Sequence, residues 1–451
     1  MTSSVLPGQK KTRFLPDINA ATAPTPRERT GFLKARPHHE LDTNRHENAS
    51  GETPVTEDDI AQFRNTLRQN LCVSMLREGF HRSFAEFFSL LERWRASREA
   101  AGPGSALWQQ RPLEKHPRKL EPLREHLTRA ESAERAGQYV EVYENYLALA
   151  RFFSEPEDRW IRYHFYELSL LSAGKIKMDS GKREAEANGH MGEVYLEQGD
   201  FELAREHYEV FYNLAVGRLW QDESGNTHHS RACMGLCRIY TLLAQRQLQT
   251  KDYRTAIQIL TKAYDMAKEG GERRMEGEAA YRVGLAYQCK GDQKAAKEFL
   301  STFAEIATGL DDAAGLGKAY KAIAKSLEIE GKMSESIEYL QKYAAVSQDS
   351  KQEQNLQDAC MCLGTIHSSR GQYDRGSDYF SQAYELACSL GSVPALRKAQ
   401  ACVGVARAHA LLRPYSAAVV TGGPRSLLAL IRWKEVREDG FVDSSGEEVM
   451  G

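Results

Sequence analysis

The sequence has no long hydrophobic run, and this absence sets the first limits on its class. No apolar stretch approaches the roughly 18 residues that a membrane-spanning helix needs, and the mean hydropathy is −0.56. The N-terminal segment Met1–Leu15 carries Lys10, Lys11 and Arg13 without the apolar segment that follows such charges in a secretory signal. We therefore expect neither a spanning helix nor a secretory signal.

A large excess of charge of one sign is also absent. The 451 residues include 60 Lys and Arg and 62 Asp and Glu, which gives a formal net charge of −2. A global basic field that would attract nucleic acid or an anionic membrane is therefore missing. We expect no nucleic-acid partner and no insertion into membranes.

Cysteine is sparse and is not arranged for disulfides or metal. The eight cysteines form no dense cluster, which is typical of reduced thiols in the cytoplasm. Cys233 and Cys237 are one helical turn apart, and Cys360 and Cys362 are separated by one residue, but neither pair has a matching Cys or His pair at zinc-ligand spacing. We expect these thiols to behave as small buried hydrophobes and the protein to hold no metal.

Motifs for catalysis are absent as well. No glycine-rich loop follows a strand to hold phosphate, because few credible strands exist. His228 and His229 lie near Asp222 and Glu223 in sequence, which would suit a metal or a general base, but a solvated loop is the simpler interpretation. The sequence thus predicts a protein that is not an enzyme, uses no cofactor and binds no small-molecule substrate.

What the sequence does contain is a pattern that recurs at a fixed spacing. A small residue is followed by Tyr, Leu or His, a turn glycine, a second small residue, and an aromatic residue or Leu. The turn glycines Gly291, Gly331 and Gly371 are each 40 residues apart. A fixed period of roughly 20–50 residues indicates a stacked repeat. The three copies span Gly284–Leu300, Ala324–Leu340 and Gly364–Phe380.

Each copy requires two antiparallel helices. Tyr320 to Leu327 place apolar residues on one helical stripe, and Ile337 to Tyr343 place them on a second stripe after the turn at Gly331. Small residues such as Ala324 let the two backbones approach, and a glycine after the first helix suits a left-handed cap. The pattern resembles the tetratricopeptide repeat, with longer helices or connectors than its usual period of about 34 residues allows. We predict an all-α fold, a right-handed α-solenoid of such helix pairs.

The N-terminal part divides into two segments. Residues 1–54 are polar and interrupted by proline, which predicts a disordered arm, either a solvated tail or a segment that orders on a partner. Residues 55–104 predict a helical hairpin with Thr56 as the first N-cap, one helix to about Gly79 and a second from Ser83 to about Ala100. The second helix carries an aromatic stripe that is either core or a docking face.

Residues 105–412 predict the solenoid, and residues 413–451 predict a tail. The array should end in a capping helix from Pro394 to Leu412, and the tail in a short helix from Ser426 to Glu438. The first half of the array is interrupted by an extra helix from about Asp158 to Ile176.

A further interruption is an insertion from Arg218 to Ser230. It lengthens the step from Gly199 to Lys251, which stands where the turn glycine would be, beyond the regular step between the later turn glycines. Insertions in solenoids map to loops on one face, often the binding face. We predict partner contacts at four residues of this loop: Trp220, Asp222, His228 and His229.

A second predicted partner site is the concave groove of the first helices. With the small residue counted as position eight, side chains at positions two, five and six face inward in such repeats. These positions include Glu186, His190, Tyr281, Arg282, Lys318, Lys321, Met361 and Cys362. We predict partner contacts at Tyr281, Arg282, Lys318, Lys321 and Lys325. The three lysines form a basic strip suited to an acidic segment, unless they are an ordinary solvated face.

Several segments also resemble an axonemal family of tetratricopeptide-repeat proteins. They are Asn70–Val73, Phe87–Trp94, Leu127–Glu131, Leu219–Gly225 and Ala322–Lys325. The resemblance implies a non-catalytic scaffold of motile cilia and sperm flagella, located in the cytoplasm, the cytoskeleton and the axoneme. It further implies an association with inner dynein arms, a need for the protein in flagellar motility and a link to intraflagellar transport.

Two other functions remain open from the sequence. One is a cytoplasmic adaptor for cargo or transport that resembles kinesin light chain or the spindle-orientation regulators, whose repeats have a similar period. The other is an enzyme whose site our motifs do not reveal. Retention in detergent-extracted axonemes would favour the scaffold over the adaptor, and a lack of nucleotide turnover would argue against the enzyme.

Overall fold

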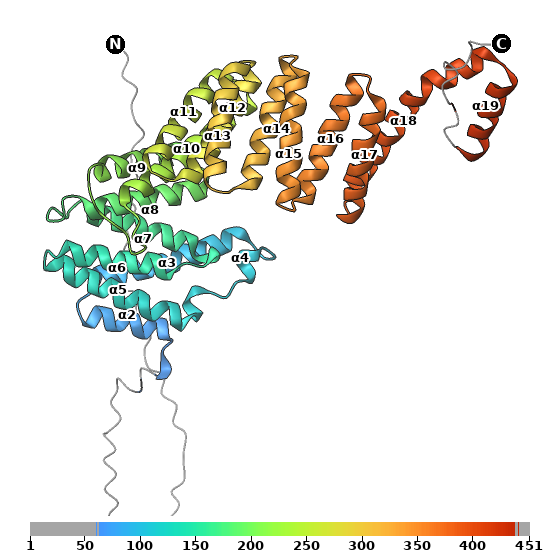
Figure 1. Cartoon of the computed structure of the whole chain (residues 1–451). Coiled ribbons are helices and arrows are strands. Elements are labelled where there is room, and N and C mark those ends of the chain that lie inside the picture. Colours follow the sequence, from blue (N-terminus) through green and yellow to red (C-terminus); the bar gives the residue numbers. More distant parts are fainter. Residues whose placement is uncertain (1–59, 61–62, 438–440, 442–451) are drawn as a thin grey trace, which may run out of the picture. The chain divides into compact units, whose positions relative to one another are not determined.

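The described part of the chain is helical almost throughout (Figure 1). The computed structural model describes residues 60, 63–437 and 441. The chain divides into residues 1–60 and 61–451, and the helices named below belong to the second part. Among the described residues there is no β-strand, only an isolated antiparallel bridge between Gln221 and Thr227. The predicted arm, residues 1–54, lies outside the described residues.

The described α-helices fall into an N-terminal group and a regular array. The N-terminal group is α2 (Leu67–Arg77), α3 (His81–Ala101), α4 (Ala106–Gln109), α5 (Pro117–Arg135), α6 (Tyr139–Phe152) and α7 (Arg159–Ala173), with short 3₁₀ turns η1 (Leu113–Lys115) and η2 (Pro156–Asp158). The array is α8 (Lys182–Gln198), α9 (Phe201–Ala215), α10 (His228–Gln249), α11 (Tyr253–Glu269), α12 (Arg273–Lys290), α13 (Gln293–Gly309), α14 (Ala313–Ile329), α15 (Met333–Asp349), α16 (Glu353–Ser369), α17 (Tyr373–Ser389), α18 (Val393–Thr421) and α19 (Pro424–Val436). None of these helices is both long and apolar enough to cross a membrane.

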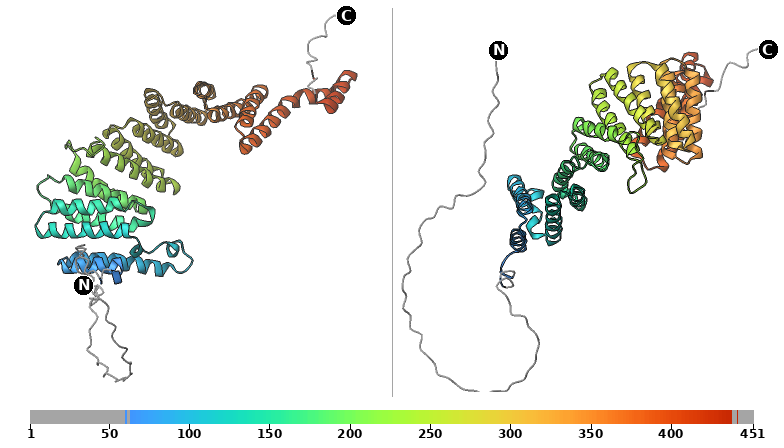
Figure 2. Two further views of the ribbon diagram at one scale, coloured as in Figure 1. Left: turned by 90° about the horizontal axis from the view of Figure 1, so that it is seen from below. Right: turned by 90° about the vertical axis from the view of Figure 1, so that its left-hand side faces the viewer.

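The array is built from helix pairs, as the regular period of the turn glycines predicts. Helices α8 and α9 form one pair, and four more pairs follow in chain order up to α16 and α17. Each second helix also packs against the first helix of the next pair, so the pairs stack side by side (Figure 2). The predicted all-α solenoid of stacked helix pairs is confirmed.

Small residues lie where the two helices of a pair meet. A Cβ atom at Gly364 of α16 would lie 2.6 Å from the Phe380 ring of α17. Tyr208 of α9 packs against Gly192 in α8 on one side and against Gly235 in α10 on the other, leaving no room for a Cβ at either glycine. The repeated small residue is therefore a steric requirement of helix contact.

The turn between the two helices of a pair uses a left-handed residue. Gly291, Gly331 and Gly371 have φ values of 95°, 78° and 73°, as their place after the first helix predicts. Lys251 stands at the same place in an earlier pair and takes φ 61° without being glycine. A side chain in this conformation costs about 1–2 kcal/mol, so the packing of α10 on α11 sets the turn there rather than local preference.

The N-terminal hairpin forms, but it begins later than expected. Helix α2 starts at Leu67, and its N-cap is Thr66, which forms a capping box with Gln69. The expected cap Thr56 lies outside the described residues. Of the aromatic stripe on α3, Phe87, Leu91 and Trp94 are buried in the N-terminal core, which is the core interpretation.

The C-terminal helix is longer than expected. Helix α18 passes through Pro414 and ends at Thr421, so the predicted end at Leu412 is wrong. Proline lacks the N–H that would bond the carbonyl of Ala410, but this part of α18 is exposed, and water can serve that carbonyl. Only Ala399 and Ala406 of α18 are buried. Helix α19 forms close to the range predicted for the short tail helix.

Two interruptions separate the regular pairs in the first half. Helix α7 packs between α6 and α8 without a partner of its own, as the extra helix predicts. The insertion between α9 and α10 covers residues 216–227 and ends at Thr227, whose hydroxyl accepts the N–H of Ser230 and caps α10. The predicted loop end at Ser230 is therefore wrong, because capping draws three more residues into the helix.

Candidate functional site

The first helices of successive pairs share one side of the array, which we call the first-helix face (α8, α10, α12, α14, α16 and α18). Neighbouring first helices contact one another directly from α8 to α16, in addition to the second helix between them. Side chains that point away from the second helices are thereby gathered along one surface. This is the surface that the predicted groove positions should line.

The larger hollow on the first-helix face lies between α8, α10 and α12 and has a volume of about 450 Å³. Its floor is apolar and includes Met234, Leu242 and Met275. Two ion pairs flank it, Arg238 with Glu193 at 3.7 Å and Arg282 with Glu278 at 3.1 Å. An apolar floor between charged rims suits one side of a peptide or helix from a partner.

Only one of the two residues predicted at this part of the groove lines the hollow. Arg282 lines it, whereas Tyr281 is half-buried with its ring 5.0 Å from that of Phe303 in the next helix. Burial raises the pKa of the Tyr281 hydroxyl, so this phenol stays protonated and serves the packing of α12 on α13.

A second hollow of about 250 Å³ lies between α14, α16 and α18. Lys321 and Lys325 of the predicted basic strip line it, together with Lys398 of α18. Lys321 Nζ lies 2.6 Å from Asp358 Oδ2. Burial acts to lower the pKa of Lys321, but the hydrogen bond and charge of Asp358 outweigh it and raise that pKa. Lys318 is exposed and does not line this hollow.

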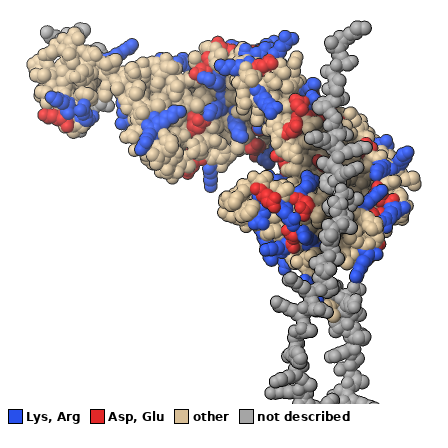
Figure 3. Space-filling model, turned by 180° about the vertical axis from the view of Figure 1, so that it is seen from behind, with Lys and Arg blue, Asp and Glu red and all other residues tan. Residues whose placement is uncertain are grey.

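The residues that the sequence argument missed here are Asp358, Lys398 and, in the larger hollow, Glu278. The same counting finds them, because all three stand at position two of their first helices when Gly364, Gly404 and Gly284 are position eight. The acidic members partly neutralise the basic strip. Figure 3 likewise shows basic and acidic side chains intermixed over one side of the molecule.

The inserted loop is held by its own hydrogen bonds and packs against the protein. Asp222 Oδ1 accepts the N–H groups of Ser224 and Asn226 at 2.9 and 3.0 Å. Glu223 forms an ion pair of 3.2 Å with Arg151 of α6. The loop therefore covers a hollow of about 240 Å³ whose other walls come from α6, α8 and α10.

The four residues predicted for this loop lie in different surroundings. Asp222 is in the loop, and Trp220 is partly buried with its ring 6.2 Å from that of His228. His228 and His229 belong to α10 and not to the loop. His228 is 1% exposed, and its Nε2 lies 2.8 Å from Glu186 Oε1. Of the two histidines, only His229 is accessible to a partner.

Glu186 and His190, two predicted groove positions, lie beneath the loop. Burial would raise the pKa of Glu186, but the hydrogen bond and charge of His228 hold it below its usual value. Burial lowers the pKa of His190 to about 4, and its ring stacks on Tyr166 at 4.9 Å. These residues line the covered hollow, so this stretch of the first-helix face is closed by the loop.

All eight cysteines are free, but their burial is uneven. Cys233, Cys237 and Cys360 are buried as predicted, whereas Cys289 and Cys388 are exposed, and for these two the prediction is wrong. Burial raises the pKa values of Cys237 and Cys360 to about 11, so both remain protonated thiols.

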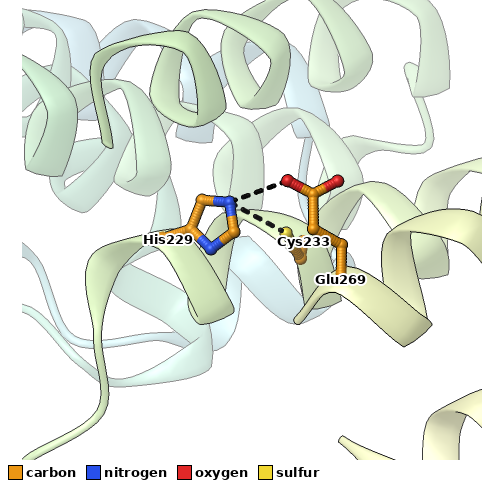
Figure 4. Close-up of side chains that lie close together, drawn as sticks. All are labelled: His229, Cys233 and Glu269. Atoms are coloured by element: carbon orange, nitrogen blue, oxygen red, sulfur yellow. Dashed lines mark hydrogen bonds and ion pairs between the residues drawn. The ribbon is translucent and has the colours of Figure 1, made fainter. Parts of the chain in front are cut away.

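One cysteine has neighbours that the sequence spacing does not reveal. Figure 4 shows Cys233 and His229, one turn apart on α10, with Glu269 at the end of α11. His229 Nε2 lies 3.1 Å from Glu269 Oε1 and 3.8 Å from Cys233 Sγ. Glu269 is far from His229 in sequence, so a search for pairs at short spacing does not detect this cluster.

The stacked helix pairs and the hollowed, charged first-helix face define a protein of the tetratricopeptide-repeat class, which serves as a scaffold for protein interactions. In agreement, the tetratricopeptide repeat family model matches residues 185–210. Tetratricopeptide repeat protein 29 of Macaca fascicularis is 42% identical over 397 residues, which cover 88% of this chain and 84% of that protein. The chain therefore belongs to the tetratricopeptide repeat protein 29 family, and the resemblance seen in its sequence is confirmed.

Two further comparisons extend this result. Tetratricopeptide repeat protein 29 of Rattus norvegicus is 50% identical over 238 residues, which cover 53% of this chain and 50% of that protein. Among solved structures, BtubC (BKLC) from P. vanneervenii is similar at 15% identity with a TM-score of 0.38, covering 52% of this chain and 92% of that one. At that score the likeness carries no information on function.

Proposed function

We propose that this chain is a non-catalytic scaffold of the axoneme in motile cilia and sperm flagella, where it is associated with inner dynein arms and is needed for flagellar motility. Membership in the tetratricopeptide repeat protein 29 family supports a role in protein interaction. The axonemal location follows from the resemblance found in the sequence and is the part that experiment must test.

The observation that carries the interaction role is the first-helix face. It offers two open hollows of about 450 and 250 Å³, both between consecutive first helices and both with charged rims. A helical or extended segment of a partner, laid along this face, would place apolar side chains on the floor of the larger hollow. Acidic side chains of the same partner would then meet Lys325 and Lys398 in the smaller one.

Rigidity makes such a surface useful as a scaffold. Each helix is fixed by close packing at its small residues, such as Gly364 against Phe380. Because the spacing of the hollows is set by the helices, a partner is selected by length and shape as well as by charge. A component of a dynein arm held in this way would have a defined place on its support.

Location and need are tested together in motile cells. The tagged full-length chain should remain with the axoneme after detergent extraction, and its deletion should reduce flagellar beating with loss of inner-arm components. A chain released completely by detergent would contradict the axonemal scaffold and favour the cytoplasmic adaptor. Normal beating after deletion would contradict the need for motility.

A further inference from the structure

Three side chains with different metal-binding atoms meet where α10 contacts the end of α11. His229 and Cys233 share one side of α10, and Glu269 is the last residue of α11 (Figure 4). One nitrogen, one sulfur and one carboxylate oxygen lie within 4.8 Å of one another. Neither the groove nor the inserted loop explains this grouping.

The distances are close to those that a tetrahedral metal ion needs. Zinc bonds of about 2.0–2.3 Å place neighbouring donor atoms about 3.3–3.6 Å apart. His229 Nε2 lies 3.1 Å from Glu269 Oε1 and 3.8 Å from Cys233 Sγ. Small side-chain rotations therefore bring the three donors to a common ion without a change in the backbone.

The donor set selects a class of metal. Imidazole, thiolate and carboxylate together suit zinc, while magnesium and calcium prefer oxygen atoms alone. Cys233 is buried, but His229 is 24% exposed and Glu269 is 40% exposed. The fourth position of a tetrahedral ion would thus face solvent and take a water molecule.

The surroundings hold the ligands in place and favour a cation. Tyr212 donates a hydrogen bond of 2.6 Å to Glu269 Oε1, and its ring lies 5.4 Å from that of His229. Such outer contacts orient metal ligands in known sites. The negative end of the α11 dipole lies beside the cluster. A Cβ atom at Gly270 would lie 2.9 Å from that of Cys233, so glycine lets the helix end approach the thiol.

From this geometry we propose that His229, Cys233 and Glu269 form a binding site for one zinc ion per chain. The ion would connect the first turn of α10 to the last residue of α11 and so hold the base of the inserted loop, which ends at Thr227. This site was not expected from the sequence, which offered only pairs of cysteines or histidines. It is independent of the axonemal role.

The state of the thiol gives the site a pH dependence. Burial, together with the charge of Glu269, raises the pKa of Cys233 to about 12, so the metal-free site holds a thiol. An ion that binds the thiolate must displace this proton, and zinc affinity should therefore rise with pH.

The test uses tag-free, full-length protein freed of metal, titrated with Zn²⁺ against a chelating indicator and, separately, with Co²⁺ to observe the cobalt–thiolate charge-transfer band. The unaltered chain should bind one ion. Cys233→Ser should remove the band and weaken zinc binding at least tenfold, and Glu269→Gln, at a more exposed ligand, should also weaken it about tenfold or more.

The matched control is Cys237→Ser, one turn further along α10, where the thiol is equally buried but outside the cluster. It should keep both the affinity and the band. Circular dichroism with a chelator present shows that each variant folds, and Glu269→Gln keeps the test decisive if Cys233→Ser does not. The proposal is overturned if the unaltered chain binds no ion, if Glu269→Gln or a folded Cys233→Ser binds as tightly as the unaltered chain, or if Cys237→Ser removes the band.

Discussion

At the scale of single residues, one carboxylate joins helices that are far apart in sequence. Glu131 of α5 is 5% exposed and accepts hydrogen bonds from the N–H and the hydroxyl of Ser83, at 2.8 and 2.7 Å. It thereby serves the free N–H groups at the start of α3, where a negative charge also suits the helix dipole. Nothing in the local sequence of either helix announces this contact.

We predict that Glu131→Gln destabilises the chain by about 1–3 kcal/mol at neutral pH, because a buried acceptor of charge-assisted bonds is lost. Burial would raise the pKa of Glu131, but the hydrogen bonds from Ser83 and Arg135 lower it below the ordinary value of 4.5. The stabilisation is therefore complete above the ordinary value and is lost as the pH falls through the lowered one. Melting temperatures of both chains from pH 7 downward should converge in acid. A gap that stays constant would contradict this role.

Close contact at the repeated small residue gives a second prediction. Gly364→Ala places a methyl group 2.6 Å from the ring of Phe380 and should cost about 1–3 kcal/mol. Gly404→Ala in α18 is the control, because no atom lies within 4 Å of its Cβ position. There alanine should gain up to about 1 kcal/mol from helix preference. Thermal unfolding of the two variants should shift in opposite directions, and equal shifts would refute the steric explanation.

At the scale of elements, α18 shows how far a helix can extend beyond its packing. Only Ala399 and Ala406 of its 29 residues are buried, and Val405, Leu412 and Val419 are more than half exposed. Its second half therefore depends on backbone hydrogen bonds and intrinsic preference, which Pro414 interrupts.

We predict that Pro414→Ala restores the hydrogen bond to the carbonyl of Ala410 and slows amide exchange in residues 411–418. An interior proline costs a helix about 3 kcal/mol, so the effect should be large in this locally stabilised segment. Pro394→Ala is the control, because Pro394 lies in the first turn, where no helical bond is lost. Hydrogen exchange followed by mass spectrometry measures both variants. Unchanged exchange around residue 414 would contradict the explanation.

The comparison of sequence with structure follows the range of the forces involved. Helix pairs were predictable because turn glycines such as Gly331 and apolar stripes such as Tyr320 to Leu327 act within one repeat. The grouping of Cys233 with Glu269 was not, because it depends on how two helices meet. The end of the inserted loop was missed for a smaller reason, since Thr227 is an ordinary N-cap residue that spacing alone did not consider.

At the scale of the whole molecule, function rests on the first-helix face. If an acidic partner segment lies there, neutralising Lys321, Lys325 and Lys398 together should weaken its binding. At about 0.5 kcal/mol for each exposed charge contact, the three sum to roughly a tenfold loss of affinity. Sedimentation of the purified chain with axonemes from cells lacking it measures this loss, which should shrink at high salt.

The control for that experiment removes the same charge from the other side of the array. Lys262, Lys294 and Lys342 are exposed on the second helices α11, α13 and α15. Their triple replacement by glutamine should leave binding unchanged, while circular dichroism shows that both triple variants keep their helices. Equal losses in the two variants would mean that net charge, and not the first-helix face, governs binding.

The central claim is that an axonemal partner lies along the first-helix face, and cross-linking mass spectrometry on isolated axonemes tests it most directly. We predict cross-links from Lys325 and Lys398, which line the smaller hollow, to subunits of the inner dynein arms. Cross-links to such subunits only from lysines of the second helices, or none to any axonemal protein, would contradict the account.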